Sequence, residues 1–196
     1  MMNPILNQNI FLIKEHLGIF KAANNYDIYD PESNQIILNC RENNLGFFSK
    51  IFRFTKYKKM TPFHLEISTA SGQKIVSMQR GTTFFRSDVK VYDEREQLIG
   101  LFKQKFWSFG GKFEVTDQNE KPVFLLQGKW TGWNFKLTHN NKELAVVTKK
   151  WNGLGKELFT SADNYVLEIK DTVAQDHKDR KLILAAVLCI DMVLKE

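Results

Sequence analysis

Residues 181–194 read KLILAAVLCIDMVL, and this run constrains the architecture more than any other part of the chain. Ala, Leu and Met favour a helix, and Asp191 is the only charge after Lys181. Crossing a bilayer takes about 20 apolar residues, so the run falls short of a transmembrane span. A helix that is apolar on every face is usually buried in protein. The sequence therefore predicts a helix over residues 181–194 that the rest of the chain encloses.

The sequence before this helix repeats a hairpin-like unit. Apolar residues alternate with polar ones, as at Phe63, Leu65 and Ile67, and a period of two is that of a strand with one buried face. A polar turn such as Ser71-Gly72 then leads into a second apolar strand. Similar units begin near residues 26, 89, 113 and 135, and a last strand begins near residue 165.

Strands at this regular spacing indicate a sandwich or a barrel. A propeller is the competing repeat, but its blades take about 40–50 residues each, and too few would fit. A helix that runs through a closed barrel satisfies both the hairpin repeat and the apolar run. We therefore expect an all-β fold with one central helix: a closed β-barrel of about twelve antiparallel strands around the apolar C-terminal helix, in a single domain over residues 1–196.

The composition places the chain among folded globular proteins, with 43% hydrophobic and 26% charged residues. Two cysteines, Cys40 and Cys189, are too few for a secreted disulfide scaffold. Residues 1–14 lack the pattern of a signal peptide, so the expected compartment is the cytoplasm. The net charge of +6 and the pI near 9.2 permit attraction to anionic lipids or nucleic acid but require neither.

Three stretches carry a resemblance to a known family. They are NYDIYD at residues 25–30, TPFHLEI at 61–67, and SADNY at 161–165 followed by LAAVLCIDM at 184–192. Together with the hairpin plan they resemble the phospholipid scramblase-like and Tubby C-terminal-like superfamily, including its LURP-one-related members, over roughly residues 10–196. The first stretch is similar to the family's first strand. The resemblance implies a Tubby-like barrel and a phospholipid-linked role.

The chain also departs from the animal scramblases. It lacks their proline-rich N-terminal extension, and residues 43–60 hold none of the clustered cysteines that accept palmitate in those proteins. It is therefore more similar to the compact bacterial-type members. A palmitate anchor is not expected.

The segment LGFFSKIFRFTKYKK at residues 45–59 interleaves aromatic rings with cations. On a helix, Phe47 and Phe48 would share a face with Ile51 and Phe52. Such rings can enter the headgroup boundary of a membrane while the cations stay near the phosphates. The alternative, which stays open, is a loop that packs its Phe side chains on the barrel. The residues predicted to bind lipid are Phe47, Phe48, Lys50, Arg53, Lys56, Lys58 and Lys59.

Acidic residues precede the C-terminal helix. The resemblance to scramblases implies a calcium-binding region here, and Asp163 matches it, with Asp171 a second weak candidate. The spacing does not fit a twelve-residue EF-hand loop. The alternative is a solvated turn, with Asp176 and Asp179 near the helix start, where acids favour the helix dipole.

No catalytic set stands out. The four histidines are scattered and form no metal-binding spacing. Trp130 and Trp151 are expected to pack at a barrel rim; the alternatives are stacking on bases or insertion among lipid headgroups. No cofactor beyond weak calcium is expected. We predict a non-enzymatic peripheral module for anionic phospholipid surfaces, at the inner face of the membrane, without a transmembrane span or a nucleic-acid partner. Genuine lipid scrambling, and a carrier or enzyme with a pocket for an apolar ligand between barrel and helix, remain the alternatives.

Overall fold

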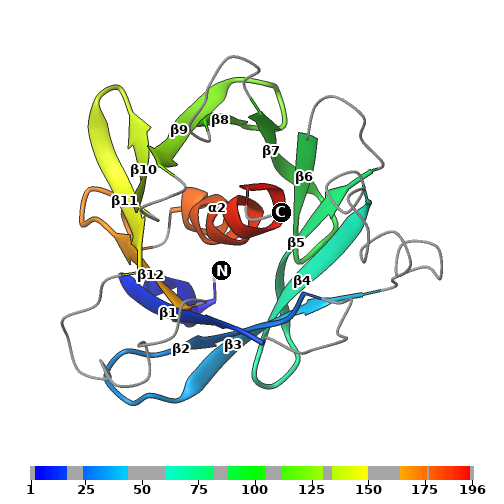
Figure 1. Cartoon of the computed structure of the whole chain (residues 1–196), viewed down its shortest axis with the longest axis vertical. Coiled ribbons are helices and arrows are strands. Elements are labelled where there is room, and N and C mark those ends of the chain that lie inside the picture. The colour runs from blue at the N-terminus through cyan, green and yellow to red at the C-terminus, as the bar shows by residue number, and fades with distance from the viewer. Residues whose placement is uncertain are drawn as a thin grey trace.

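In this computed structural model the strands form one sheet that closes around a helix (Figure 1). The structure describes residues 3–16, 24–43, 61–81, 88–104, 112–129, 134–149, 164–175 and 177–194. In β4, Phe63, Leu65 and Ile67 are buried, while the His64 and Glu66 between them are half-exposed. The alternation of apolar and polar residues in this part of the sequence therefore places apolar side chains inside the barrel and polar ones outside.

In the described part of the chain, twelve strands pair in sequence order, and β1 pairs with β12 to close the ring; every pairing is antiparallel. The predicted closed barrel of about twelve antiparallel strands around a C-terminal helix is confirmed. The elements are a short 3-10 helix η1 (Pro4–Asn7), then β1 (Ile10–Glu15), β2 (Tyr26–Tyr29), β3 (Ile36–Glu42), β4 (Phe63–Thr69), β5 (Lys74–Arg80), β6 (Asp88–Asp93), β7 (Leu98–Gln104), β8 (Lys112–Thr116), β9 (Pro122–Lys129), β10 (Asn134–His139), β11 (Lys142–Thr148), β12 (Asn164–Ile169) and α2 (Asp179–Leu194).

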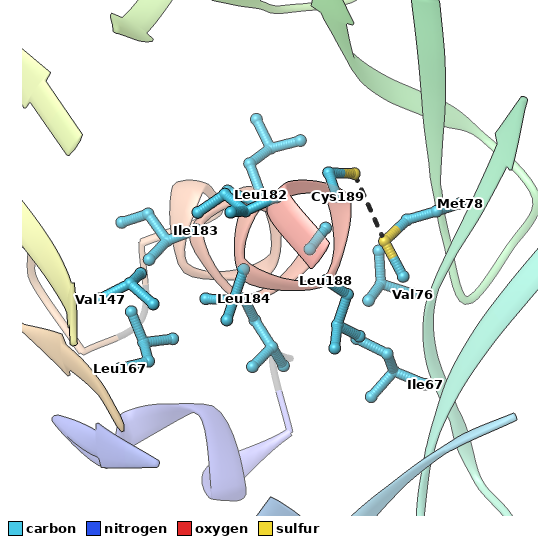
Figure 2. Packing of buried hydrophobic residues seen from close by; sticks show 14 of the residues in the cluster. Ile67, Val76, Met78, Val147, Leu167, Leu182, Ile183, Leu184, Leu188 and Cys189 are labelled. Atoms are coloured by element: carbon cyan, nitrogen blue, oxygen red, sulfur yellow. Dashed lines mark hydrogen bonds between the residues drawn. The ribbon is translucent and has the colours of Figure 1, made fainter. Parts of the chain in front are cut away.

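The helix α2 lies along the middle of the barrel (Figure 1). Its residues from Leu182 to Ile190 are at most 3% exposed. Leu167 and Val147 face it from one side of the wall, and Ile67 faces it from the other (Figure 2). The predicted buried helix is confirmed, beginning two residues earlier, at Asp179. No helix in the described residues has the length and apolarity needed to cross a membrane.

The two ends of the barrel are built differently. At one end, short turns join the strands, and α2 begins there; we call it the turn end. Asp93 and Asp117 occupy equivalent positions in two of these turns, and each side chain accepts two backbone N–H bonds of its own turn. At the opposite end, the loop end, strands are joined through residues 17–23, 44–60, 82–87, 105–111, 130–133 and 150–163, which lie outside the described residues.

The first strand differs from the prediction. The sequence pattern places the opening strand at residues 25–30, and this is wrong, because β1 (Ile10–Glu15) precedes it. Leu12 points to the side of the wall opposite Phe11 and Ile13, yet all three are fully buried. A strand buried on both faces reads as a continuous apolar run without alternation, so β1 carried no period-two signal.

Arg180 closes the turn end around the first turn of α2. Its side chain is only 1% exposed, and all five of its N–H donors are used. They reach the carbonyl oxygens of residues 6, 8, 173 and 174 and the side-chain oxygen of Asn9, at 2.8–3.0 Å. One guanidinium therefore joins the N-terminal segment, the connection after β12, and the helix.

A glycine in the barrel wall allows the helix to pack closely against β7. A Cβ atom on Gly100 of β7 would lie 2.7 Å from a methyl carbon of Leu182 and 2.8 Å from the carbonyl oxygen of Thr116. Because such contacts are shorter than real Cβ atoms allow, only glycine lets α2 enter this close to β7.

Because α2 is buried, a charged side chain introduced at its centre should destabilise the protein. Leu188→Asp should lower the free energy of unfolding by several kcal/mol, on the order of 4 or more, because it places a carboxylate among fully buried apolar groups. Denaturant unfolding measures the change. Ile36→Asp, at a position 40% exposed on β3, is the matched control and should cost far less. A Leu188→Asp protein as stable as the wild type would contradict the buried helix.

Candidate functional site at the loop end

The residues predicted to bind lipid all belong to the connection between β3 and β4. Phe47, Phe48, Lys50, Arg53, Lys56, Lys58 and Lys59 lie outside the described residues, so their role stays a prediction. The residues on both sides of the connection are described, and they belong to adjacent strands. The Asn43 N–H donates to the His64 carbonyl at 3.0 Å, so the chain leaves β3 and rejoins at β4 at the loop end.

Arg80 fastens the place where this connection returns. It is the last residue of β5, it is 3% exposed, and its Nη2 donates to the Thr61 carbonyl at 2.8 Å. Its guanidinium also lies over the Phe63 ring, 4.7 Å from the ring centre, which is a favourable cation–π distance. Arg80 therefore holds the entry to β4 from inside the barrel.

A second buried polar contact lies beside the last turns of α2. The Tyr26 hydroxyl donates to Asp191 Oδ2 at 2.5 Å, and both side chains are at most 3% exposed. Burial raises the pKa of Tyr26 well above its ordinary value, and the charges of Asp191 and Tyr165 raise it further. A lone buried charge in an apolar helix is costly without a partner, and the Tyr26 hydroxyl supplies that partner for Asp191.

Tyr26, Arg80, Tyr165 and Asp191 form what we call the mouth cluster: four buried side chains with polar groups at the loop end of a mostly apolar interior. Two of them carry opposite charges. Buried charges are retained only when they are paired or hydrogen-bonded, and hydrogen bonds from the mouth cluster reach the start of β4 and the helix. The start of β2 is consequently tied to α2, and the residues before β4 are tied to the end of β5.

An ion-pair network flanks the loop end on the outer surface of β2. Asp27 is 6% exposed; its two oxygens lie 2.6 Å from Arg41 Nη2 and 2.6 Å from His16 Nε2. Burial alone would raise the pKa of Asp27, but the hydrogen bonds from Arg41 and His16 outweigh it and hold that pKa below its ordinary value. Arg41 also donates to the Tyr26 carbonyl at 2.6 Å, which ties the network to the strand that carries the mouth cluster.

The predicted calcium ligands are not brought together by described contacts. Asp171 lies at the turn end, where its Oδ1 accepts a bond from Asn9 Nδ2 at 2.7 Å. Asp163 lies outside the described residues, and Asn164, which follows it, begins β12 at the loop end. Within the described ranges, no group of three or more His, Cys, Asp or Glu residues is arranged to hold a metal ion. Calcium binding stays a prediction.

The two thiols are poor nucleophiles. Cys40 and Cys189 are buried inside the barrel, and burial raises the pKa of both. Cys189 contacts the sulfur of Met78 (Figure 2). Because the thiolate is the reactive form, both cysteines are suited to packing in the core.

Several of these residues gave little sequence signal. Arg80 and Arg180 are inward-facing arginines at element ends, and nothing in their spacing separates them from surface cations. His16, Asp27 and Arg41 come together only through the pairing of β1, β2 and β3. Asp191 was identifiable, because a single acid in an apolar run must find a partner.

Comparisons with known proteins give one consistent result. A family model described as Scramblase matches residues 3–196. Human phospholipid scramblase 2 is 21% identical over 207 residues, which cover 98% of this chain and 67% of that protein. A phospholipid scramblase family protein of Schizosaccharomyces pombe is 21% identical over 222 residues, covering 98% of this chain and 56% of its own length. This chain thus spans between about half and two thirds of the length of these relatives.

One solved structure, of a protein from Arabidopsis thaliana, has a similar fold. It aligns with a TM-score of 0.55 at 12% identity and covers 99% of this chain and 95% of its own. At this identity the likeness concerns the fold alone.

The network around Asp27 predicts a pH-dependent stability difference. A carboxylate whose pKa is lowered by folding stabilises the protein above its unfolded pKa of about 3.9, and this is lost as the pH falls through the folded value. Arg41→Gln should therefore cost about 1 kcal/mol at neutral pH, a figure kept small because the Arg41 side chain is 39% exposed.

Urea unfolding at a series of pH values measures this difference. It should shrink below about pH 4, where protonated Asp27 no longer gains from Arg41. Arg95→Gln, at an exposed turn position, should show little effect at any pH. If Arg41→Gln lowers the free energy of unfolding equally at acidic and neutral pH, the stabilising effect of Arg41 does not come from its contact with Asp27.

Proposed function

This chain belongs to the scramblase family, and from that premise we propose that it is a peripheral module that binds the surface of anionic phospholipid membranes through the loop end of its barrel. The role is one of binding rather than catalysis. The inner leaflet of a plasma membrane is the anionic surface that a cytoplasmic protein meets, so the proposed place of action is that face of the membrane.

The observation that carries the proposal is the unequal distribution of charge between the connections and the barrel. The six connections at the loop end hold ten of the 28 Lys and Arg residues and only two of the 22 acidic residues. Their net charge is therefore +8, whereas the chain as a whole carries +6. The rest of the protein is slightly acidic, and a charge of this kind at one end favours an oriented approach to an anionic surface.

Aromatic residues follow the same distribution. All four tryptophans lie in these connections, as do ten of the 16 phenylalanines. Trp and Phe are the rings that enter the boundary between headgroups and acyl chains. Five cations and four phenylalanines occur in residues 44–60 alone, without a single acid, and this segment remains the strongest candidate for contact.

The burial of α2 supports the same conclusion. The most apolar run in the sequence is already enclosed by the barrel, so membrane contact falls to the connections that leave the wall. Arg80 and the His64 carbonyl hold the two stems of the 44–60 connection at adjacent strands. A fixed stem lowers the entropy lost when such a segment binds a surface.

Lipid scrambling is the second candidate, because the relatives carry phospholipid scramblase names. Moving a headgroup through a bilayer needs a polar path, whereas the described core of this barrel consists mostly of apolar side chains. We therefore place surface binding first.

Vesicle flotation with charged and neutral lipids tests the proposal. Replacing Lys56, Lys58 and Lys59 by Gln should weaken binding to anionic vesicles by about 1–3 kcal/mol, since each cation near such a surface contributes about 1 kcal/mol. Added salt should shrink the difference. Replacing Phe47 and Phe48 by Ser should weaken binding with little dependence on salt, because ring burial is the part removed.

A control with the same change of net charge uses Lys90, Lys121 and Lys142, which are exposed and lie outside the loop-end connections. Replacing these by Gln should leave binding nearly unchanged. Equal losses in the two triple variants would mean that net charge alone drives binding. A Phe47/Phe48 variant that melts at a lower temperature but floats normally would show that the rings pack on the barrel instead. Transfer of labelled lipid between leaflets would favour scrambling.

A further inference from the structure

A cavity of about 400 Å³ opens at the turn end, where α2 begins. This volume lies within the range of small-molecule sites. It is formed by two neighbouring hairpin turns and the first turn of the helix, at the opposite end of the barrel from the proposed membrane-binding segment. Among the described residues, its lining combines carboxylates, lysines and apolar side chains.

Two carboxylates of the cavity are held rigidly by their own turns. Asp93 Oδ1 accepts the backbone N–H groups of Arg95 and Gln97, both at 2.9 Å. Asp117 Oδ1 accepts those of Asn119 and Lys121 at 2.8 and 2.9 Å. In both residues the second oxygen, Oδ2, makes no hydrogen bond to any described residue. The turns therefore present two fixed acceptors that a ligand could use.

A third carboxylate of the cavity is incompletely satisfied. Asp179 Oδ1 is enclosed from solvent and has no hydrogen-bond partner in the described part of the chain. Its Oδ2 lies 3.3 Å from His177 Nδ1. An enclosed acceptor without a donor is costly, and the negative charge of this carboxylate adds to the attraction of a cation in the cavity.

The charge of the lining is negative overall. Among the described lining residues are four carboxylates and two lysines, and one of these lysines, Lys181, is already paired with Glu94. Between the charged groups lies an apolar part made by Ile99, Val123 and Leu182. The complementary ligand is a cation of about two charges with an apolar stretch between them.

The residues that line the cavity suit one class of cation better than the others. Its carboxylates are spread around the cavity, and within the described residues none of them joins a group that could coordinate a metal ion. Quaternary ammonium groups are held by aromatic cages, and none of the described residues that line this cavity is aromatic. A protonated primary amine, which donates N–H bonds, matches the free carboxylate oxygens.

We propose that the turn-end cavity binds a small aliphatic diamine or polyamine, with its ammonium groups at Asp93 and Asp117, near the charge of Asp179, and its methylene chain on Ile99, Val123 and Leu182. The cavity and the loop end use different residues, so this proposal and the membrane-binding proposal can fail independently.

Calorimetric titration with cadaverine tests it, with n-pentylamine as the probe of equal length and one charge. Cadaverine should bind more tightly than n-pentylamine. The double variant Asp93→Asn, Asp117→Asn should weaken cadaverine binding by at least about 10-fold. Asparagine keeps the oxygen that each turn uses and removes only the charge, so the melting temperature should change little.

Two further variants provide a second test of the cavity and a control outside it. Gln118→Lys adds a cation at an exposed lining position and should also weaken cadaverine binding without disturbing either turn. Glu32→Gln, on an exposed turn away from the cavity, should leave binding unchanged. Binding of cadaverine by the double variant as tightly as by the wild type, no binding by the wild type, or equal losses with Glu32→Gln would each overturn the proposal. So would calcium that displaces cadaverine at lower concentration.

Discussion

The structure depends on enclosing a helix that has no polar face. An apolar helix of this length is stable only where protein covers it all round, and a sheet can do this only by closing on itself. Closure also removes the exposed edges that an open sheet presents to other chains. Two polar residues then set the depth of α2 in the barrel: Arg180 is fixed at the turn end by five hydrogen bonds, and Asp191 is fixed at the loop end by Tyr26. They are eleven residues apart, or about 16 Å along the helix axis, so α2 is held near both ends.

This arrangement assigns different tasks to different parts of the barrel. The wall and the helix are occupied by packing, and Cys40 and Cys189 belong to that packing. The charged and aromatic residues that could bind a partner lie at the two ends of the barrel. The turn-end connections are mostly short and are acidic overall, whereas the loop-end connections are mostly longer and are basic and aromatic in sequence. A protein polarised in this way can meet an anionic surface with one end and leave the other accessible from solution.

The sequence predicted most of the fold because its signals were local. Alternation identified strands such as β4, and an apolar run without charges identified α2. It missed β1, whose side chains are buried on both faces, because burial of that kind erases the alternation on which the prediction relied. The positions of Arg80 and Arg180 were also beyond reach, since their role depends on carbonyl groups that are distant in the chain. The turn-end cavity needed the adjacency of two hairpins, although the equivalent positions of Asp93 and Asp117 were visible in the repeat.

Hydrogen exchange of the α2 backbone amides, with and without anionic vesicles, tests most directly whether the helix is a permanent part of the core. If the barrel encloses α2 in both states, its amides exchange among the slowest in the protein and keep that protection when vesicles are bound. Loss of protection in α2 on vesicle binding, with the strands still protected, would show that the helix leaves the barrel to enter the membrane. That result would contradict a peripheral protein built around a buried helix.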